Sequence, residues 1–257
     1  MEAIGLTISI LSLAALAQTA VDCFQSVQLG KNFGTDFQTT CIRLDNAQLQ
    51  LSRWGKALEL SRQQHAISSL EASVTAQDVQ QAESLLGHII NLFKKAEEAS
   101  HKFQAKHEHT PVVEVRDVLT TDAMALHDRM RALCLERQKT TSRVQKAKWA
   151  LYKKRDLDRL VDDIQQLIGD LVVLFPIMSP TQAQLCDHEA AQLRDETALP
   201  RLKELAAHQD ATLGDALDRL SPITMTASHT WNNLDNTKVV NQVAGNQTVH
   251  GGQTISL

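Results

Sequence analysis

Apolar residues recur at intervals of three and four through most of this 257-residue chain. Between residues 37 and 58 they are Phe37, Cys41, Leu44, Leu51, Trp54 and Leu58. This spacing places them on one face of a helix. The same spacing marks 79–103, 121–154 and 156–171, and more weakly 180–220. The pattern predicts an all-α domain of packed amphipathic helices, with no strand before residue 237.

Local signals set the expected helix boundaries. Thr75 and Asp78 have the spacing of a capping box and predict a helix start. Pro111 and the segment 112–115 are expected to form a loop, and Pro200 is expected to break the last helical region. One long helix is predicted from about Thr121 to Lys154, with Leu126, Met130, Leu133, Val144 and Leu151 facing inward. Trp54 and Trp149 lie on such faces, and we expect both to be at least partly buried.

The segment Ala3–Val21 carries no charge. It is close to the ~20 residues of a membrane span, but five Ser, Thr and Gln side chains dilute it. Ala15-Leu16-Ala17 imitates a signal-peptidase site, yet the basic start of a secretory signal is missing. The third interpretation, a buried first helix of the bundle, is the one we favour for the resting protein.

The composition changes at Ser221, where a proline and small polar residues predict a flexible linker over 221–236. Lys238 is the last charge, and beyond it apolar and polar residues alternate with the period of a strand. Stacked on copies of itself, such a segment forms cross-β structure, whereas in a monomer it has too little apolar surface to fold. A polar, disordered terminus is the alternative. The expected amyloid core comprises Val239, Asn241, Gln242, Val243, Gly245, Asn246, Gln247, Val249, Gly251, Gln253 and Ile255.

No catalytic motif is present: the chain has no Gly-rich phosphate loop, no Gly-x-Ser-x-Gly and no His-Glu-x-x-His. We therefore expect no enzyme, no cofactor and no metal. The net charge of -4 argues against a nucleic-acid partner. Four cysteines without metal-ligand spacing suit a reducing compartment.

One segment, 139–159, is strongly basic, with eight Lys or Arg against two Asp. As a helix face it would suit anionic lipid head groups, at about 1 kcal/mol per cation. A solvated face paired with acidic neighbours is the alternative. The candidate head-group contacts are Lys139, Arg143, Lys146, Lys148, Lys153 and Lys154.

Three stretches, VDCFQSVQLGKNFGTDFQ (21–38), RLDNAQLQLSRWGKAL (43–58) and RQKTTSRVQKAKWALYKKRDLDRLVDDI (137–164), closely resemble the HeLo domain of the fungal HET-s/HET-S heterokaryon-incompatibility family. The resemblance covers about residues 1–220 and implies a HeLo-type helical bundle that can dimerise. In that family a C-terminal prion-forming motif folds as a β-solenoid amyloid. The tail at 237–257 departs from the family pattern, because it is one short uncharged segment rather than two longer charged repeats.

The resemblance implies a membrane-permeabilising cell-death effector that is cytoplasmic at rest and moves to the plasma membrane. Its expected partners are further copies of itself, membrane lipids, and a NOD-like receptor whose matching motif templates the tail. The alternative is a non-toxic, prion-forming or inhibitory interaction protein of the same family. The segment 1–21 would insert in the membrane through Ile4, Leu6, Ile8, Ile10, Leu11, Leu13, Leu16 and Val21.

Overall fold

The computed structural model describes residues 2–30, 37–63, 73–106, 112–113, 119–138, 149–151, 154–194 and 196–220. The side chains of 2–9, 29–30, 112–113 and 151 are outside this description. The chain divides into two units, Met1–Pro222 and Ile223–Leu257. The predicted linker and amyloid core lie outside the described residues, so what we expect of them stays a prediction.

The described part of the first unit is mainly helical, as the sequence predicts. Five helices of 17 residues or more come first in the chain: α1 (Glu2–Phe24), α2 (Phe37–Gln63), α4 (Ala76–Lys106), α5 (Thr121–Arg137) and α6 (Lys154–Leu174). The last four elements are shorter: the 3-10 helix η2 (Pro176–Met178), α7 (Ser179–Leu193), α8 (Leu199–Gln209) and α9 (Ala211–Leu220).

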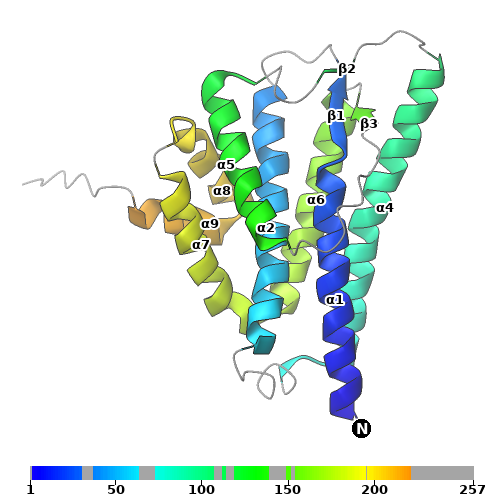
Figure 1. Ribbon diagram of the computed structural model, residues 1–257, viewed down its shortest axis with the longest axis vertical. Coiled ribbons are helices and arrows are strands. Elements are labelled where there is room, and N and C mark those ends of the chain that lie inside the picture. Colours follow the sequence, from blue (N-terminus) through cyan, green and yellow to red (C-terminus); the bar gives the residue numbers. More distant parts are fainter. Residues whose placement is uncertain are drawn as a thin grey trace, which may run out of the picture. The chain divides into compact units, whose positions relative to one another are not determined.

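Helix α2 separates two hydrophobic cores (Figure 1). On one side it packs with α1, α4 and α6, and contributes Leu51 and Trp54 to the first core. On the other it packs with α5, α7 and α8, and contributes Ile42 and Leu49 to the second. Both faces of α2 are therefore buried, as expected for a central helix of a layered bundle.

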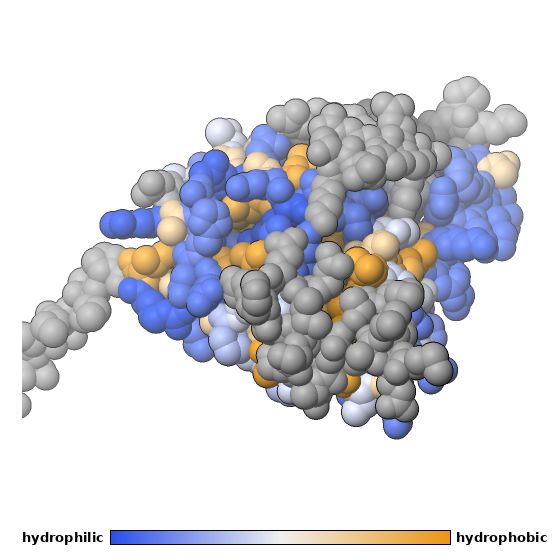
Figure 2. Space-filling model, turned by 60° about the horizontal axis from the view of Figure 1, so that its bottom comes forward, coloured by the Kyte–Doolittle hydropathy of each residue, from blue (hydrophilic) through white to orange (hydrophobic). Residues whose placement is uncertain are grey.

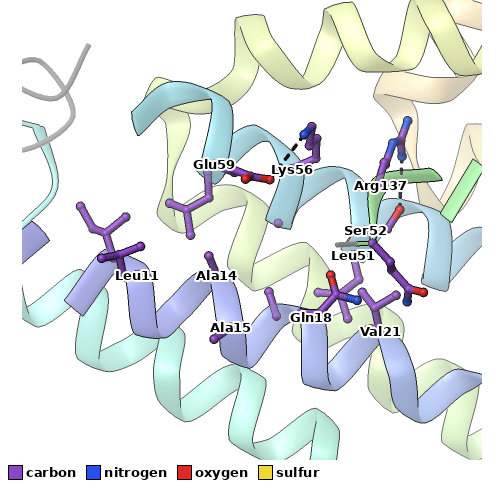
Figure 3. A pocket seen from close by; sticks show the side chains of 15 residues that line it. Leu11, Ala14, Ala15, Gln18, Val21, Leu51, Ser52, Lys56, Glu59 and Arg137 are labelled. Atoms are coloured by element: carbon purple, nitrogen blue, oxygen red, sulfur yellow. Dashed lines mark hydrogen bonds and ion pairs between the residues drawn. The ribbon is translucent and has the colours of Figure 1, made fainter. Parts of the chain in front are cut away.

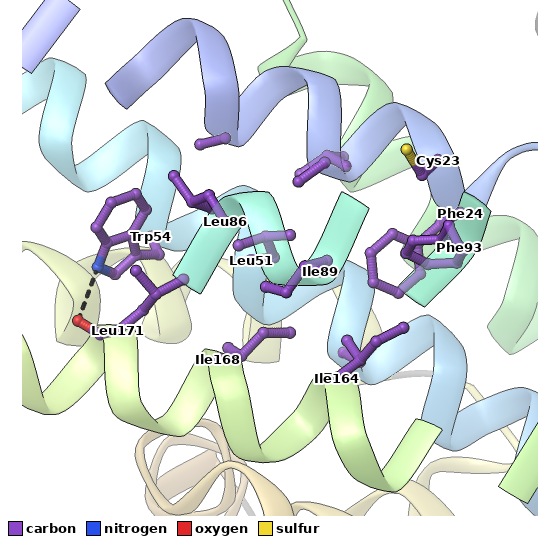
Figure 4. Packing of buried hydrophobic residues seen from close by; sticks show 14 of the residues in the cluster. Cys23, Phe24, Leu51, Trp54, Leu86, Ile89, Phe93, Ile164, Ile168 and Leu171 are labelled. Carbon is purple, nitrogen blue, oxygen red and sulfur yellow. Dashed lines mark hydrogen bonds between the residues drawn. The ribbon is translucent and has the colours of Figure 1, made fainter. Parts of the chain in front are cut away.

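The first core is closed at one end by Trp54, which is fully buried (Figure 4). Its indole Nε1 donates a hydrogen bond to the carbonyl oxygen of Leu171 in α6, at 3.2 Å. Its ring meets that of Phe175 edge-on, with centroids 5.5 Å apart. Phe24 of α1 and Phe93 of α4 make a second edge-on pair at 4.8 Å. Aromatic pairs of this geometry add about 0.5–1.5 kcal/mol beyond their buried area.

The capping box at Thr75 is confirmed. Asp78 accepts from the backbone N–H of Thr75 at 2.8 Å, and the Asp78 N–H donates to Thr75 Oγ1 at 3.1 Å. The predicted break near Pro200 is confirmed: α7 ends at Leu193 and α8 begins at Leu199, with Pro200 in the first turn of α8, where its missing N–H has no intrahelical partner to lose.

Two expectations are wrong. The long helix from Thr121 ends at Arg137, and strands do occur before residue 237. A small sheet has the order β2-β1-β3, with β1 (Val27–Gly30) antiparallel to β2 (Val112–Val113) and parallel to β3 (Trp149–Leu151). In the register, Val27 lies opposite Trp149, and Leu29 opposite Val113.

The side chain of Trp149 explains why its segment leaves the helical pattern. The backbone N–H of Trp149 donates to Ser26 O at 2.9 Å, and its indole Nε1 donates to Ser26 Oγ at 3.1 Å. The indole is buried, as expected, but on a strand. Pairing with a residue 123 positions away overrides the local helical preference, and strands of two to four residues are too short to show alternation.

Candidate functional site

Helix α1 lies against α2 and α4, and these two surfaces form what we call the α1 seat (Figure 1). The buried side chains of α1 follow the intervals of three and four: Ile10, Leu13, Ala17, Ala20, Val21 and Phe24. Of the predicted insertion residues, Ile10, Leu13 and Val21 are thus buried and Leu16 is half-buried, whereas Leu11 is 45% exposed. The side chains of Ile4, Leu6 and Ile8 lie outside the described residues.

Two small residues face each other where α1 meets α2. A Cβ placed on Gly55 of α2 would lie 3.4 Å from the Cβ of Ala17. Small side chains at such a crossing let two helices pack at short range through dispersion contacts. A Cβ on Gly55 would make ordinary van der Waals contact, so a small side chain fits there, whereas a bulky side chain at either position would push the two helices apart.

The described polar contacts from α1 to its neighbours use uncharged donors. Ser12 Oγ donates to Glu83 of α4 at 3.1 Å, and Gln48 of α2 donates to the carbonyl oxygen of Val21 at 3.4 Å. Gln138 donates to Asp22 at 2.9 Å. Within the described part of the chain, no salt bridge involves α1. The seat therefore holds α1 mainly by apolar burial.

Several polar side chains of α1 are satisfied within α1 itself. Thr19 Oγ1 donates to Ala15 O at 3.0 Å, and Cys23 Sγ donates to Thr19 O at 3.3 Å. Gln18 donates to Asp22 Oδ1, one turn later, at 3.2 Å. Such bonds stay with the helix wherever it goes, and back-bonding of this kind is how hydroxyl groups are accommodated in membrane helices.

The C-terminal end of α1 is fixed. The chain turns after Phe24, where the N–H of Ser26 donates to Cys23 O at 3.2 Å, and then enters β1. The two bonds from Trp149 hold Ser26 in this turn.

Among the residues that the structure describes, no helix has both the length and the apolarity to span a membrane.

The predicted basic helix face is corrected. Strand β3 interrupts the segment 139–159, and Trp149 is turned into the core rather than toward a surface. Lys154 is the exposed first residue of α6. The other candidate head-group contacts, Lys139, Arg143, Lys146, Lys148 and Lys153, lie outside the described residues.

A buried charge cluster that sequence reasoning missed joins α2 to α7, α9 and the end of α5. Arg53 pairs with Glu189 of α7 at 2.7 Å and with Asp210, which also accepts from the Leu213 N–H at the start of α9. The second oxygen of Glu189 pairs with Arg137 at 2.6 Å. Burial raises the pKa of Glu189, and the two guanidinium groups oppose this rise.

A weak sequence signal for this cluster exists. Glu189 lies three residues after Cys186 and four before Leu193, so it interrupts an apolar stripe of α7 with a charge. Two arginines and two acids balance in number, so the cluster is neutral overall. The cluster therefore connects α2 to α7 and to the start of α9, two helices that contribute to the second core.

Within the described ranges no group of three or more His, Cys, Asp or Glu could hold a metal ion. All four cysteines are free and buried, and burial raises the pKa of Cys134 to about 12. Burial also raises the pKa of Cys41 and Cys186, whereas a nucleophilic cysteine has a lowered pKa.

The helical unit is similar to a known protein family. A family model named HeLo, described as prion-inhibition and propagation, matches residues 5–202. The chain is 35% identical over 217 residues to heterokaryon incompatibility protein s of Podospora anserina, covering 84% of this chain and 73% of that protein. It is 35% identical over 208 residues to heterokaryon incompatibility protein S of the same species, covering 80% and 70%.

Solved structures agree with these matches. The HET-s N-terminal domain superposes with a TM-score of 0.68 at 32% identity, over 80% of this chain and 95% of that one. A double mutant of the same domain gives a TM-score of 0.69 at 33% identity, over 80% and 97%.

Proposed function

The chain belongs to the HeLo family, and from that premise we propose that it is a membrane-permeabilising effector of regulated cell death in heterokaryon incompatibility. At rest the protein is cytoplasmic, with α1 in its seat. On activation it moves to the plasma membrane, where α1 leaves the seat, pivots about residues 25–26 and inserts.

The observation that carries this proposal is the chemistry of the α1 seat. Moving Ile10, Leu13, Val21 and Phe24 into water would cost roughly 6–12 kcal/mol, at about 1.5–3 kcal/mol per large side chain. Inserting the same side chains into the apolar interior of a bilayer keeps them out of water and avoids this cost. Since no salt bridge holds the described part of α1, its departure separates no ion pair there, and Glu83, which accepts from Ser12, is exposed and can pair with water instead. The same apolar surface of α1 therefore stabilises the seated helix in water and the inserted helix in lipid.

The polar residues of α1 favour insertion as a group of helices. At ~1.5 Å per residue, a 23-residue helix is about 35 Å long, against a hydrocarbon core of about 30 Å. Ser12 and Thr19 lie seven residues apart, on one helix face. Polar residues inside a membrane face other helices or a water-filled lumen. We therefore expect several α1 helices to assemble with this face inward.

The trigger in this proposal is the segment 237–257. A NOD-like receptor with a matching motif templates it into a cross-β stack, and the stack gathers helical domains from several copies of the chain. The basic residues of 139–154, of which Lys154 is exposed, hold these domains on anionic head groups.

A reversible lock on α1 tests the proposal. In the double variant Ala17→Cys with Gly55→Cys, the two Cβ atoms would lie near 3.4 Å, close to the ~3.8 Å of a disulfide. Oxidised protein, seeded with preformed fibrils of 237–257, should not release dye from anionic vesicles. Reduction should restore release to the level of the parent.

The controls are the two single variants under the same oxidant, which should behave as the parent does. Equal dye release from locked and reduced protein would show that α1 does not leave its seat. If neither the parent nor the reduced variant ever permeabilises vesicles or kills cells that express a seeding partner, the effector function is wrong.

A further inference from the structure

A groove of about 290 Å³ runs between α1 and α2 (Figure 3). Leu11, Ala14 and Ala15 of α1 lie along one side, and Leu51 and Lys56 of α2 lie on the other. The groove is partly open to solvent, and most of its lining is apolar. Its size and lining are those of a small-molecule site at the lower end of the usual range, about 300–1,000 Å³.

The groove between α1 and α2 exists because side chains along α1 are small. Ala14 and Ala15 stand where larger apolar residues would fill the interface, although α1 and α2 touch at Ala17 and Gly55. The groove has about twice the volume of the ~150 Å³ apolar cavity that holds one benzene molecule, which is room for a chain of roughly ten carbons. An aromatic ligand of that volume fits a narrow groove between two helices less well than an extended chain.

The charged groups of the lining set the polarity of an occupant. Arg137 is already engaged by Glu189 at 2.6 Å and Ser52 at 3.2 Å. Lys56 contacts Glu59 at 3.4 Å, one turn along α2, and its side chain is 31% exposed. The Glu59 side chain is 12% exposed, and a contact of this length between residues three apart on one helix is weak, so the Lys56 ammonium can also pair with another carboxylate. Since Glu189 neutralises Arg137, Lys56 is the cation of the lining that a ligand can reach.

We propose that this groove binds a free fatty acid of about ten to twelve carbons. The chain lies along Leu11, Ala14 and Ala15, and the carboxylate pairs with Lys56 at the rim. A ligand that touches α1 and α2 together binds the seated arrangement and loses half its contacts when α1 departs. By linkage it stabilises the seated state and opposes release, so this regulatory part rests on the function proposed above.

Binding is tested first without membranes. Decanoate, below its micellar concentration, is titrated into the full-length chain by calorimetry. One site is expected, with a rise in Tm of about 5 °C or more when decanoate exceeds its Kd 100-fold. Ala15→Trp fills the groove from an exposed position of α1, and Lys56→Glu removes the cation; each should weaken binding at least tenfold.

Lys102→Glu is the matched control, since it makes the same charge change on an exposed face of α4 and should leave the Kd unchanged. Decanol should bind at least tenfold more weakly than decanoate. Absence of saturable binding, or a Kd that neither groove variant changes, would overturn the site. Equal binding of decanol would overturn the role of Lys56.

The regulatory part is tested by seeded dye release from vesicles. Decanoate should slow release by the parent protein at least tenfold, and should not slow release by Lys56→Glu at the same concentration. If decanoate binds and release is not slowed, the regulatory part is overturned. If the parent never releases dye, the proposed function fails, whereas the binding result in solution still decides the site.

Discussion

Leu11 and Leu13 lie two residues apart in α1 and point to opposite sides of it: Leu13 is fully buried in the first core, and Leu11 is 45% exposed. The two positions therefore separate two roles of the same helix. A charge at position 13 would lie in the buried core of the folded domain, whereas a charge at position 11 is partly in water there and would meet an apolar environment only in the bilayer-inserted state proposed above.

We expect Leu11→Lys to fold like the parent, within about 0.5 kcal/mol, because exposed substitutions rarely change stability by more. The lysine adds ~2.5–3.5 kcal/mol to insertion at the centre of a membrane helix. Seeded dye release should fall sharply, while fibril formation by the tail and the thermal melt stay unchanged. Leu13→Lys is the contrast and should unfold the domain. A folded Leu11→Lys protein that permeabilises like the parent would make α1 a core helix only.

Trp54→Ala should destabilise the domain by about 3–5 kcal/mol, because it empties a fully buried site and removes the hydrogen bond to Leu171 O. Trp54→Phe keeps most of the volume and should cost about 1–3 kcal/mol through the unpaired carbonyl. Urea unfolding measures both. In a Trp231→Phe background, acrylamide should quench Trp54 and Trp149 poorly; free access to either indole would contradict the burial seen here.

Arg53→Met should destabilise by roughly 3–5 kcal/mol, since Glu189 and Asp210 lose the cation between them. Combining Arg53→Met with Glu189→Gln should recover part of that loss, because one buried negative charge is then removed. The comparison is made by chemical denaturation of the single and double variants. Strictly additive losses would show that Arg53 and Glu189 do not interact energetically.

Stability should fall as the pH rises above about 6.5. His127 Nδ1 lies 2.8 Å from Asp45 Oδ2. Burial alone lowers the pKa of His127, but the charge and hydrogen bond of Asp45 outweigh it, so the pKa is raised overall. Arg131 opposes this rise and Asp128 adds to it.

Stability falls as the pH rises because the folded protein binds its protons more tightly than the unfolded chain does. A His with a raised pKa in the folded state contributes its full stabilisation below its ordinary value and loses it as the pH passes the raised one. Burial also raises the pKa of Asp45, so this carboxyl group too lowers the stability as the pH rises. Thermal melts between pH 6 and 8.5 should show a falling Tm, with a smaller slope in His127→Gln. An equal slope in that variant would assign the effect to other groups, such as Glu189, whose pKa is also raised.

A peptide of residues 237–257 should form cross-β fibrils with a ~4.8 Å reflection and a thioflavin response, while residues 1–220 stay soluble and helical. Gln247→Lys and Val249→Asp should each block assembly, because an in-register stack repeats the new charge at every layer. A peptide that remains monomeric at high concentration would remove the proposed trigger.

The sequence by itself determined the helical class, the capping box at Thr75 and the burial of Trp54. These properties are local, because helical periodicity shows which side chains share a face, and a cap involves residues three positions apart. Family membership was also readable, because several long stretches resemble HeLo sequences.

Only the tertiary structure decided which remote segments meet. Val27 pairs with Trp149, Arg53 with Glu189, and Ala17 approaches Gly55, and no periodicity encodes these partners. Trp149 shows the physical reason: its neighbours favour a helix, but two hydrogen bonds to Ser26 and burial of the indole favour a strand there. The groove beside Leu11 depends in the same way on the distance between α1 and α2, which side chains from both helices set together.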